Sequence, residues 1–217
     1  MKKPLAVWVV VLTNLFLIES AIAKEARRIV TKNEIVELFR SMKAELDPHN
    51  GPGAGECYFA LKWGSTAIPK SEALKYLKLR ISTDITPSSE LSTPVEILGA
   101  AGFPGSLFCD ERRLQADIET RYRQEFTAKP PSEVKPGQSC IDVGTEEVGF
   151  PILNNNHDRA LVTYSDSADL YKQGEDGTIS RVSSSGGSGI LVYGKKNGTW
   201  SKIDFVELSN WDGPSCY

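Results

Sequence analysis

The sequence predicts an α+β protein, with amphipathic helices and a short hairpin in its N-terminal half and an antiparallel β-meander in its C-terminal half. Apolar residues recur with helical periodicity before residue 128, whereas after residue 139 short alternating runs are separated by Gly, Asn and Asp turns. Helices that precede strands, instead of alternating with them, are typical of α+β proteins. Four cysteines follow an export signal, so we also expect disulfides to staple the fold.

The first 23 residues form a secretory signal peptide. Lys2 and Lys3 precede an apolar stretch over residues 5–18, and the small-residue end is Ala21-Ile22-Ala23. The apolar stretch is shorter than the roughly 20 residues that span a bilayer. We therefore expect cleavage after Ala23, a periplasmic or secreted location, and a mature chain that is not embedded in a membrane.

The net charge of the chain indicates which classes of partner to expect. Removal of Lys2, Lys3 and Glu19 from 25 basic and 28 acidic residues leaves 23 and 27, a net charge of −4. An acidic chain without a Lys/Arg-rich block has no face that would neutralise phosphates, so we expect no nucleic-acid partner. The sequence leaves the oligomeric state open.

Four cysteines fit two disulfides. Cys57, Cys109, Cys140 and Cys216 allow three pairings, and we favour Cys57–Cys109 with Cys140–Cys216 because each half of the chain then has its own staple. The halves are a helix-rich part, residues 24–127, and a β-rich part, residues 140–217. Residues 128–139, with three prolines and a glycine, form a linker or a connecting loop. The two halves are separate or belong to one domain.

Three helices are expected in the first half. The first covers residues 32–46, where Thr31 and Glu34 form a capping box and apolar residues recur on one face. The others cover residues 94–101 and 107–127. A strand is expected over residues 57–63. Residues 77–81 alternate like the second strand of a hairpin, but residues 71–81 also fit a helix, and we keep both alternatives.

The alternating pattern of the second half predicts short strands joined by tight turns. Alternating runs cover residues 140–143, 160–164, 178–182, 190–193 and 200–208. Asn197-Gly198 and Asp176-Gly177 are the strongest hairpin signals. The Ser/Gly-rich residues 183–189 are expected to form a flexible loop between two strands.

The sequence offers little that predicts catalysis. It contains no G-x-S-x-G elbow, so no catalytic residue is assigned, and His157 with Asp158 are only weak candidates in a polar loop. All four cysteines are better explained as bridges, and we expect neither a metal site nor a cofactor. Asp166, Asp169 and the acidic residues near 175 are interpreted as a solvated acidic edge.

The functional hypothesis is an exported, non-catalytic protein-binding domain, for example an inhibitor or an immunity-type protein that neutralises a toxin in the periplasm. The acidic charge would suit a basic partner. Aromatic side chains of the second half are the candidate contact residues, because Tyr and Trp are enriched at interfaces. They are Tyr164, Tyr171, Tyr193, Trp200 and Trp211.

Two alternatives remain. One is an exported hydrolase that uses His157. The other is a small-ligand pocket between the helices and a curved sheet. Helices followed by a meander that ends in the Asn197-Gly198-Thr199-Trp200 turn and strand resemble cone-shaped α+β folds of the nuclear-transport-factor-like kind, over about the last third of the chain. The resemblance rests on no specific motif, and we assign no family from it.

Overall fold

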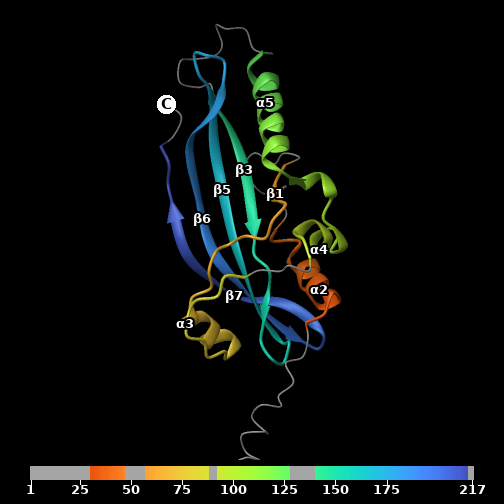
Figure 1. The fold of residues 1–217 in the computed structure, drawn as a ribbon. Coiled ribbons are helices and arrows are strands. Elements are labelled where there is room, and N and C mark those ends of the chain that lie inside the picture. Colours follow the sequence, from red (N-terminus) through yellow and green to blue (C-terminus); the bar gives the residue numbers. More distant parts are fainter. Residues whose placement is uncertain (1–29, 47–56, 88–91, 128–139, 215–217) are drawn as a thin grey trace, which may run out of the picture.

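The computed structural model describes residues 30–46, 57–87, 92–127 and 140–214 and has the expected α+β architecture (Figure 1). The helical elements precede the long strands. They are α2 (Lys32–Met42), α3 (Lys70–Glu72), the π-helical turn η2 (Ala73–Leu77), α4 (Pro94–Ala100), the 3-10 turn η3 (Gly105–Leu107) and α5 (Glu111–Thr127). The strands are β1 (Phe59–Ala60), β2 (Phe108–Cys109), β3 (Cys140–Val148), β4 (Ile152–Leu153), β5 (Arg159–Gln173), β6 (Ile179–Lys196) and β7 (Thr199–Trp211).

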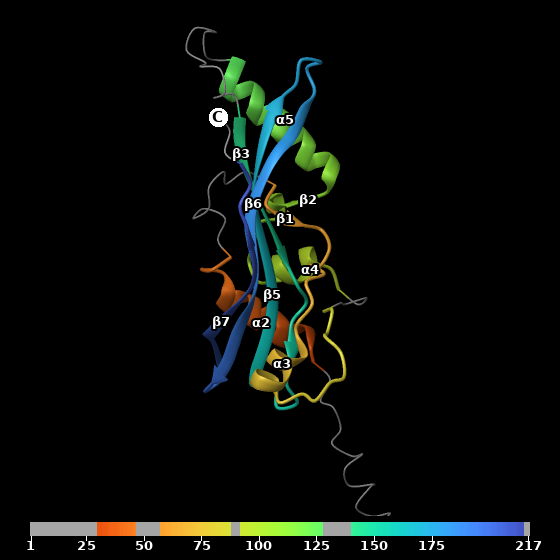
Figure 2. The ribbon, with the colours of Figure 1, turned by 90° about the vertical axis from the view of Figure 1, so that its left-hand side faces the viewer.

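All described strands belong to one sheet, in the order β2-β1-β3-β5-β6-β7, with β4 beside β5. Strands β3, β5, β6 and β7 pair antiparallel, whereas the two-residue strands β1 and β2 run parallel to their neighbours. At about 3.3 Å per residue, the 18 residues of β6 extend for roughly 60 Å. The strands therefore form the long axis of the molecule, with α5 beside one end and α2 and α3 beside the other (Figures 1 and 2).

The first face of the sheet carries α2 and α4. Because residues alternate along a strand, Ala160, Val162 and Tyr164 of β5 point to this face, and Leu191 and Tyr193 of β6 join them. The helices supply the opposite side of this core. Their buried apolar residues are Ile35, Val36, Leu38, Phe39, Met42, Ile97 and Leu98.

A capping box at each N-terminus determines where these two helices begin. Thr31 and Glu34 form the expected capping box of α2, and Thr93 and Glu96 form a second one at the start of α4. Each box fixes where its helix begins and therefore which residues face the sheet.

The second face carries η2 at one end and α5 at the other. Leu161 of β5 packs with Ala73 and Leu77 of the π turn. Further along, Ile118 and Tyr122 of α5 pack in a separate cluster with residues of β3, β5 and β6, namely Ile141, Val143, Tyr171 and Ile179.

The expected short hairpin of the N-terminal half is wrong. Its first strand is reduced to Phe59–Ala60, which pairs with β2 and β3, and residues 70–77 are helical. The helical alternative for residues 71–81 is therefore the better one. Spacing of four residues places Ala73 and Leu77 on the same face of the helical segment, and both pack in the core. The helical segment ends at Lys78, whose φ of 59° is left-handed.

The expected loop over residues 183–189 is also wrong, because these residues form the middle of β6. They pair with β5 on one side and, from Gly186, with β7 on the other. A Cβ atom on Gly189 would lie 2.5 Å from the Phe205 ring, so glycine lets this ring lie across the strand. The small residues therefore make room for aromatic rings from β7.

The predicted hairpin turns are confirmed. Asn197 and Gly198 have φ values of 53° and 83° between β6 and β7, as a type I′ turn requires, and Gly177 has a φ of 82° between β5 and β6. Helix α5 begins at Glu111 instead of residue 107, because residues 105–109 form η3 and β2 and Asp110 caps the Arg113 amide at 2.8 Å.

The Cys57–Cys109 disulfide is present as expected. Cys140 is also disulfide-bonded, whereas Cys216, its expected partner, lies outside the described residues. The signal peptide, residues 1–23, and the linker, residues 128–139, lie outside them too. Within the described ranges, no helix combines the length and apolarity needed to cross a membrane.

Candidate functional site

His157 and Asp158 occupy a tight turn between β4 and β5. His157 is 5% exposed and has a φ of 55°. Its Nδ1 lies 3.1 Å from Oε1 of Glu34, the residue that caps α2. Asp158 accepts a hydrogen bond of 2.7 Å from the Asn154 side chain. The contact with Glu34 joins the β4–β5 turn to the N-terminus of α2, which accounts for the position of the imidazole.

Replacing His157 by alanine should therefore lower the free energy of unfolding by about 1.5–3 kcal/mol, because the partly buried Glu34 carboxylate loses one of its hydrogen-bond partners. Burial alone would raise the pKa of Glu34, but hydrogen bonds from Thr31 and His157 outweigh it and lower the pKa from 4.5 to about 2. A carboxyl with a lowered pKa stabilises the fold above pH 4.5 and loses this contribution as the pH falls through 2.

Chemical denaturation at pH 7 and pH 3 measures both effects. His157→Ala should be destabilised more at pH 7 than at pH 3. His157→Asn is the matched control for the backbone, since asparagine tolerates a positive φ but is too short to replace the contact. Equal stability of His157→Asn and the unmodified chain at pH 7 would show that the contact between His157 and Glu34 contributes nothing.

The five aromatic candidates do not share one surface. Tyr193 and Trp200 belong to the core of the first face, and the Tyr193 hydroxyl donates a 2.9 Å hydrogen bond to Glu45. Tyr171 packs under α5 on the second face. Trp211 donates its indole N–H to the Ser184 hydroxyl at 3.4 Å. Only Tyr164 lies next to a hollow of the sheet, together with several carboxylates.

One of these carboxylates, Asp166, forms a pair with a carboxylate of the adjacent strand. Glu146 of β3 is directly opposite Asp166 of β5, so both side chains point to the first face. Tyr58 donates a hydrogen bond to Glu146, and the Tyr164 hydroxyl is hydrogen-bonded to Asp166. We call Tyr58, Glu146, Tyr164 and Asp166 the carboxyl–tyrosine cluster.

Backbone pairing fixes the position of Tyr58 in this cluster. Its N–H donates to Leu107 at 2.8 Å, and its carbonyl accepts from the Glu146 amide at 2.8 Å. The neighbouring residue, Cys57, is tied to Cys109 at the end of β2. The disulfide and two backbone hydrogen bonds therefore hold the phenol against Glu146.

The surroundings of Glu146 strongly shift the pKa of its carboxyl group. The side chain is 2% exposed, and within the described part of the chain its Oε1 has no hydrogen-bond partner. Burial raises its pKa from 4.5 to about 8, the Tyr58 hydrogen bond opposes this shift, and the nearby Asp166 charge adds to it. Burial also raises the pKa of Tyr58, which therefore remains a hydrogen-bond donor. Perturbed acids of this kind are typical of functional sites.

An acidic groove extends from the cluster across β6 and β7. It has a volume of about 360 Å³ and contains Asp166, Glu207 and Asp212 but, among the described residues, no basic side chain. Its remaining lining residues are Tyr164, Ser185, Gly186, Gly187, Ser188, Phe205, Ser209 and Asn210. A Cβ atom on Gly187 would lie 3.7 Å from the Asp166 carboxylate, so the floor of the groove is shallow. Phe205 is 45% exposed beside it.

A second, larger hollow lies on the other side of Glu146. This β1 cleft, of about 830 Å³, is lined by residues of the segments 57–65, 109–114 and 145–147. Glu146 thus lies between the β1 cleft and Asp166, which lines the acidic groove.

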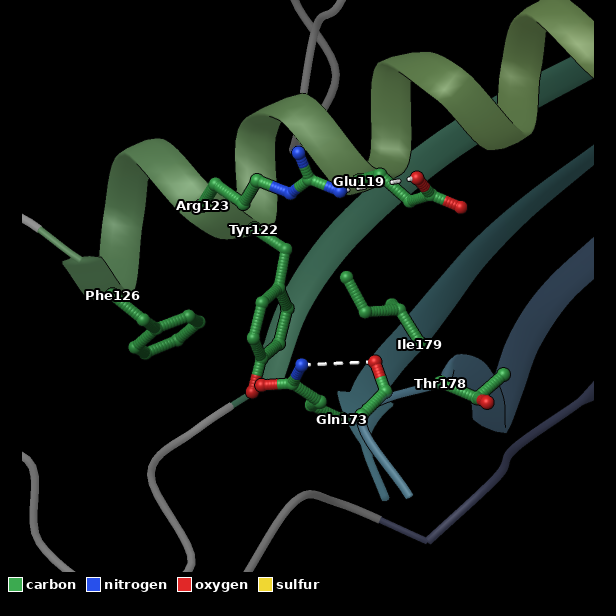
Figure 3. A pocket seen from close by; sticks show the side chains of 8 residues that line it. Glu119, Tyr122, Arg123, Phe126, Gln173, Thr178 and Ile179 are labelled. Atoms are coloured by element: carbon green, nitrogen blue, oxygen red, sulfur yellow. Dashed lines mark hydrogen bonds and ion pairs between the residues drawn. The ribbon is translucent and has the colours of Figure 1, made fainter. Parts of the chain in front are cut away.

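A third hollow, of about 430 Å³, lies between α5 and the β5–β6 turn (Figure 3). Here Glu119 pairs with Arg123 at 3.6 Å, and the Gln173 amide donates to the Gly177 carbonyl at 2.9 Å. These polar side chains satisfy one another, so this hollow is explained by the packing of α5 on the hairpin.

Comparison with known protein families, curated proteins and solved structures found no match.

The sequence analysis missed Tyr58, Glu146 and Glu207 as site residues. The strand expected at residues 140–143 continues to Val148, and Thr145, Glu146 and Glu147 were outside it. Continued alternation from Ile141 to Val148 was the available signal, because it places a glutamate on the same face as Val148. Asp166 was assigned to a solvated edge together with Asp169, but alternation along β5 puts these two side chains on opposite faces.

Proposed function

We propose that the protein is an exported, non-catalytic protein-binding domain that receives a basic segment of another protein in its acidic groove. An inhibitor or an immunity-type protein that neutralises a toxin is a concrete form of this function. The observation that supports it is the arrangement of three carboxylates around a shallow floor, with no basic side chain among the described lining residues. Carboxylates arranged in this way steer and orient a cationic partner.

The aromatic side chains at the groove also suit a basic binding segment. The rings of Tyr164 and Phe205 lie at the groove together with Asp166 and Glu207. Lysine and arginine side chains lay their aliphatic stems on apolar surface while their charged heads meet carboxylates, and their cations are attracted to aromatic faces. Net charge of −4 in the mature chain has the sign that attracts such a partner.

We do not extend the hydrolase alternative, because the His157 Nδ1 is engaged by Glu34 inside the fold. The alternative of a small-ligand pocket is favoured by a separate observation, the β1 cleft.

Replacing Glu207 by glutamine should weaken binding of the partner about three- to fivefold at low ionic strength, and the difference should shrink as salt is added. The experiment captures exported proteins from the source cells on the immobilised mature chain and then measures the affinity of the captured protein by calorimetry. Glu175→Gln is the matched control, since it removes one exposed carboxylate at the β5–β6 turn, outside the groove.

The proposal requires a basic protein that binds the unmodified chain and Glu175→Gln equally and Glu207→Gln more weakly. Equal affinity for all three proteins, or the absence of a stoichiometric partner, contradicts it.

A further inference from the structure

The β1 cleft has the size and the lining of a small-molecule site. Its volume of about 830 Å³ is within the range of ligand pockets, roughly 300–1,000 Å³. Leu61 lines it and is 39% exposed, although it is a large apolar residue. Tyr58, Trp63 and Leu114 add partly exposed aromatic and aliphatic surface. An apolar body would bury this surface.

One polar group of the lining stands out. Glu146 is among the lining residues, is almost fully buried, and has in Oε1 an acceptor without a hydrogen-bond partner among the described residues. Leaving a buried acceptor unsatisfied destabilises the fold, and a like charge directly opposite adds to this destabilisation. A ligand that supplies a positive charge and a hydrogen-bond donor would remove both penalties.

The rest of the lining also favours a cation. Asp110, Glu111 and Glu147 lie around the cleft with Lys62 and Arg112, so the acidic side chains outnumber the basic ones even without Glu146. Across the described ranges, no group of three or more His, Cys, Asp or Glu side chains is arranged to hold a metal ion. An organic cation fits the single buried carboxyl and the apolar walls better than a metal ion does.

We propose that the β1 cleft binds a small organic ammonium compound, whose charged nitrogen meets the Glu146 carboxylate and whose apolar body lies against Tyr58, Leu61 and Trp63. This site is independent of the acidic groove, so it stands whether or not the groove binds a protein. The groups that face Glu146 are Tyr58, which precedes β1, and Tyr164 and Asp166 of β5, and none of them is a cation that would compete with the ligand.

Calorimetric titration of the mature, oxidised chain with 2-phenylethylammonium at pH 7 tests the proposal. Two probes of the same shape accompany it, the neutral 2-phenylethanol and the anionic 3-phenylpropionate. We expect the ammonium to bind at least about tenfold more tightly than the alcohol, as a charge-assisted hydrogen bond predicts, and the acid to bind more weakly than either. Binding should also release a proton from Glu146, so the measured enthalpy should change between buffers of different ionisation enthalpy.

Two variants locate the site. Glu146→Gln should lose at least about tenfold in affinity for the ammonium and lose the buffer dependence, while its affinity for the alcohol stays the same. Glu207→Gln, which removes a carboxylate of the acidic groove, should bind all three probes like the unmodified chain. Equal binding of the ammonium and the alcohol, an unchanged affinity of Glu146→Gln, or no binding of the ammonium at millimolar concentration overturns the proposal.

Discussion

Glu146→Gln should stabilise the folded protein, and the increase in the free energy of unfolding should grow as the pH rises from 4.5 to 8. The carboxyl has a higher pKa in the folded chain than in the unfolded chain. Between these two values the folded state binds more protons, so stability falls as the pH rises. Above pH 8 the full cost of ionising a buried acid opposes folding. Glutamine keeps the shape of the side chain and an oxygen that accepts from Tyr58, but it does not ionise.

The size of this effect follows from the two pKa values. A pKa of about 8 in the folded chain against 4.5 in the unfolded chain corresponds to at most about 5 kcal/mol at high pH. Urea unfolding at pH 5, 7 and 9 measures it. Glu147→Gln changes the next residue of β3, which is exposed, and should leave the stability nearly unchanged at each pH. A Glu146→Gln protein whose stability follows the same pH dependence as the unmodified chain would contradict the burial of an ionisable carboxyl here.

Such a destabilising group is itself an argument for function. Proteins usually pair a buried carboxylate with a cation, and here Glu146 instead faces another carboxylate, Asp166. A position that lowers stability and that glutamine would improve is typical of sites where binding is favoured at the expense of the fold. Glu146 lines the β1 cleft and Asp166 lines the acidic groove, and each proposal has its own variant and its own control.

Local sequence patterns were sufficient to predict the elements that form through local interactions. The capping box at Thr31 and Glu34 defines the start of α2 to the residue, whereas the helix ends at Met42, before the expected residue 46. The Asn197-Gly198 pair defines the β6–β7 turn, because its backbone requires positive φ at both positions. The Cys57–Cys109 pairing followed from the expectation that each half carries its own bridge.

Elements that depend on distant partners were not predictable in this way. Residues 183–189 have the composition of a flexible loop, and only the flanking strands and the rings of Phe205 and Trp211 hold them extended. Strand β1 is two residues long and exists through parallel pairing with β2 and β3. The contact between Glu146 and Asp166 depends on the register of β3 and β5, which no local pattern specifies. The site was therefore missed where the tertiary structure, and not the local sequence, determines the neighbours.

Removal of the Cys57–Cys109 disulfide should lower the free energy of unfolding by about 4 kcal/mol, because the bridge closes a loop of 52 residues in the unfolded chain. For a chain of this size the melting temperature should fall by roughly 10 °C. The double variant Cys57→Ala/Cys109→Ala isolates this bridge, whereas a reducing agent would also open the bond of Cys140. Melting curves of the variant and the unmodified chain, each with and without reductant, separate the two contributions. A melting temperature indifferent to the double substitution would contradict the prediction.

The same variant tests whether the bridge supports the candidate site. Strands β1 and β2 pair over only two residues, so the disulfide beside Tyr58 is the covalent link that holds β1 against β2 at this edge of the sheet. If β1 loosens, water reaches Glu146 and its pKa returns toward 4.5. The decline of stability between pH 4.5 and 8 should then flatten in the double variant, and its affinity for 2-phenylethylammonium should fall. An unchanged pH dependence together with a lowered melting temperature would mean that the backbone bonds of Tyr58 alone keep β1 in place and that the bridge stabilises the fold without shaping the cleft.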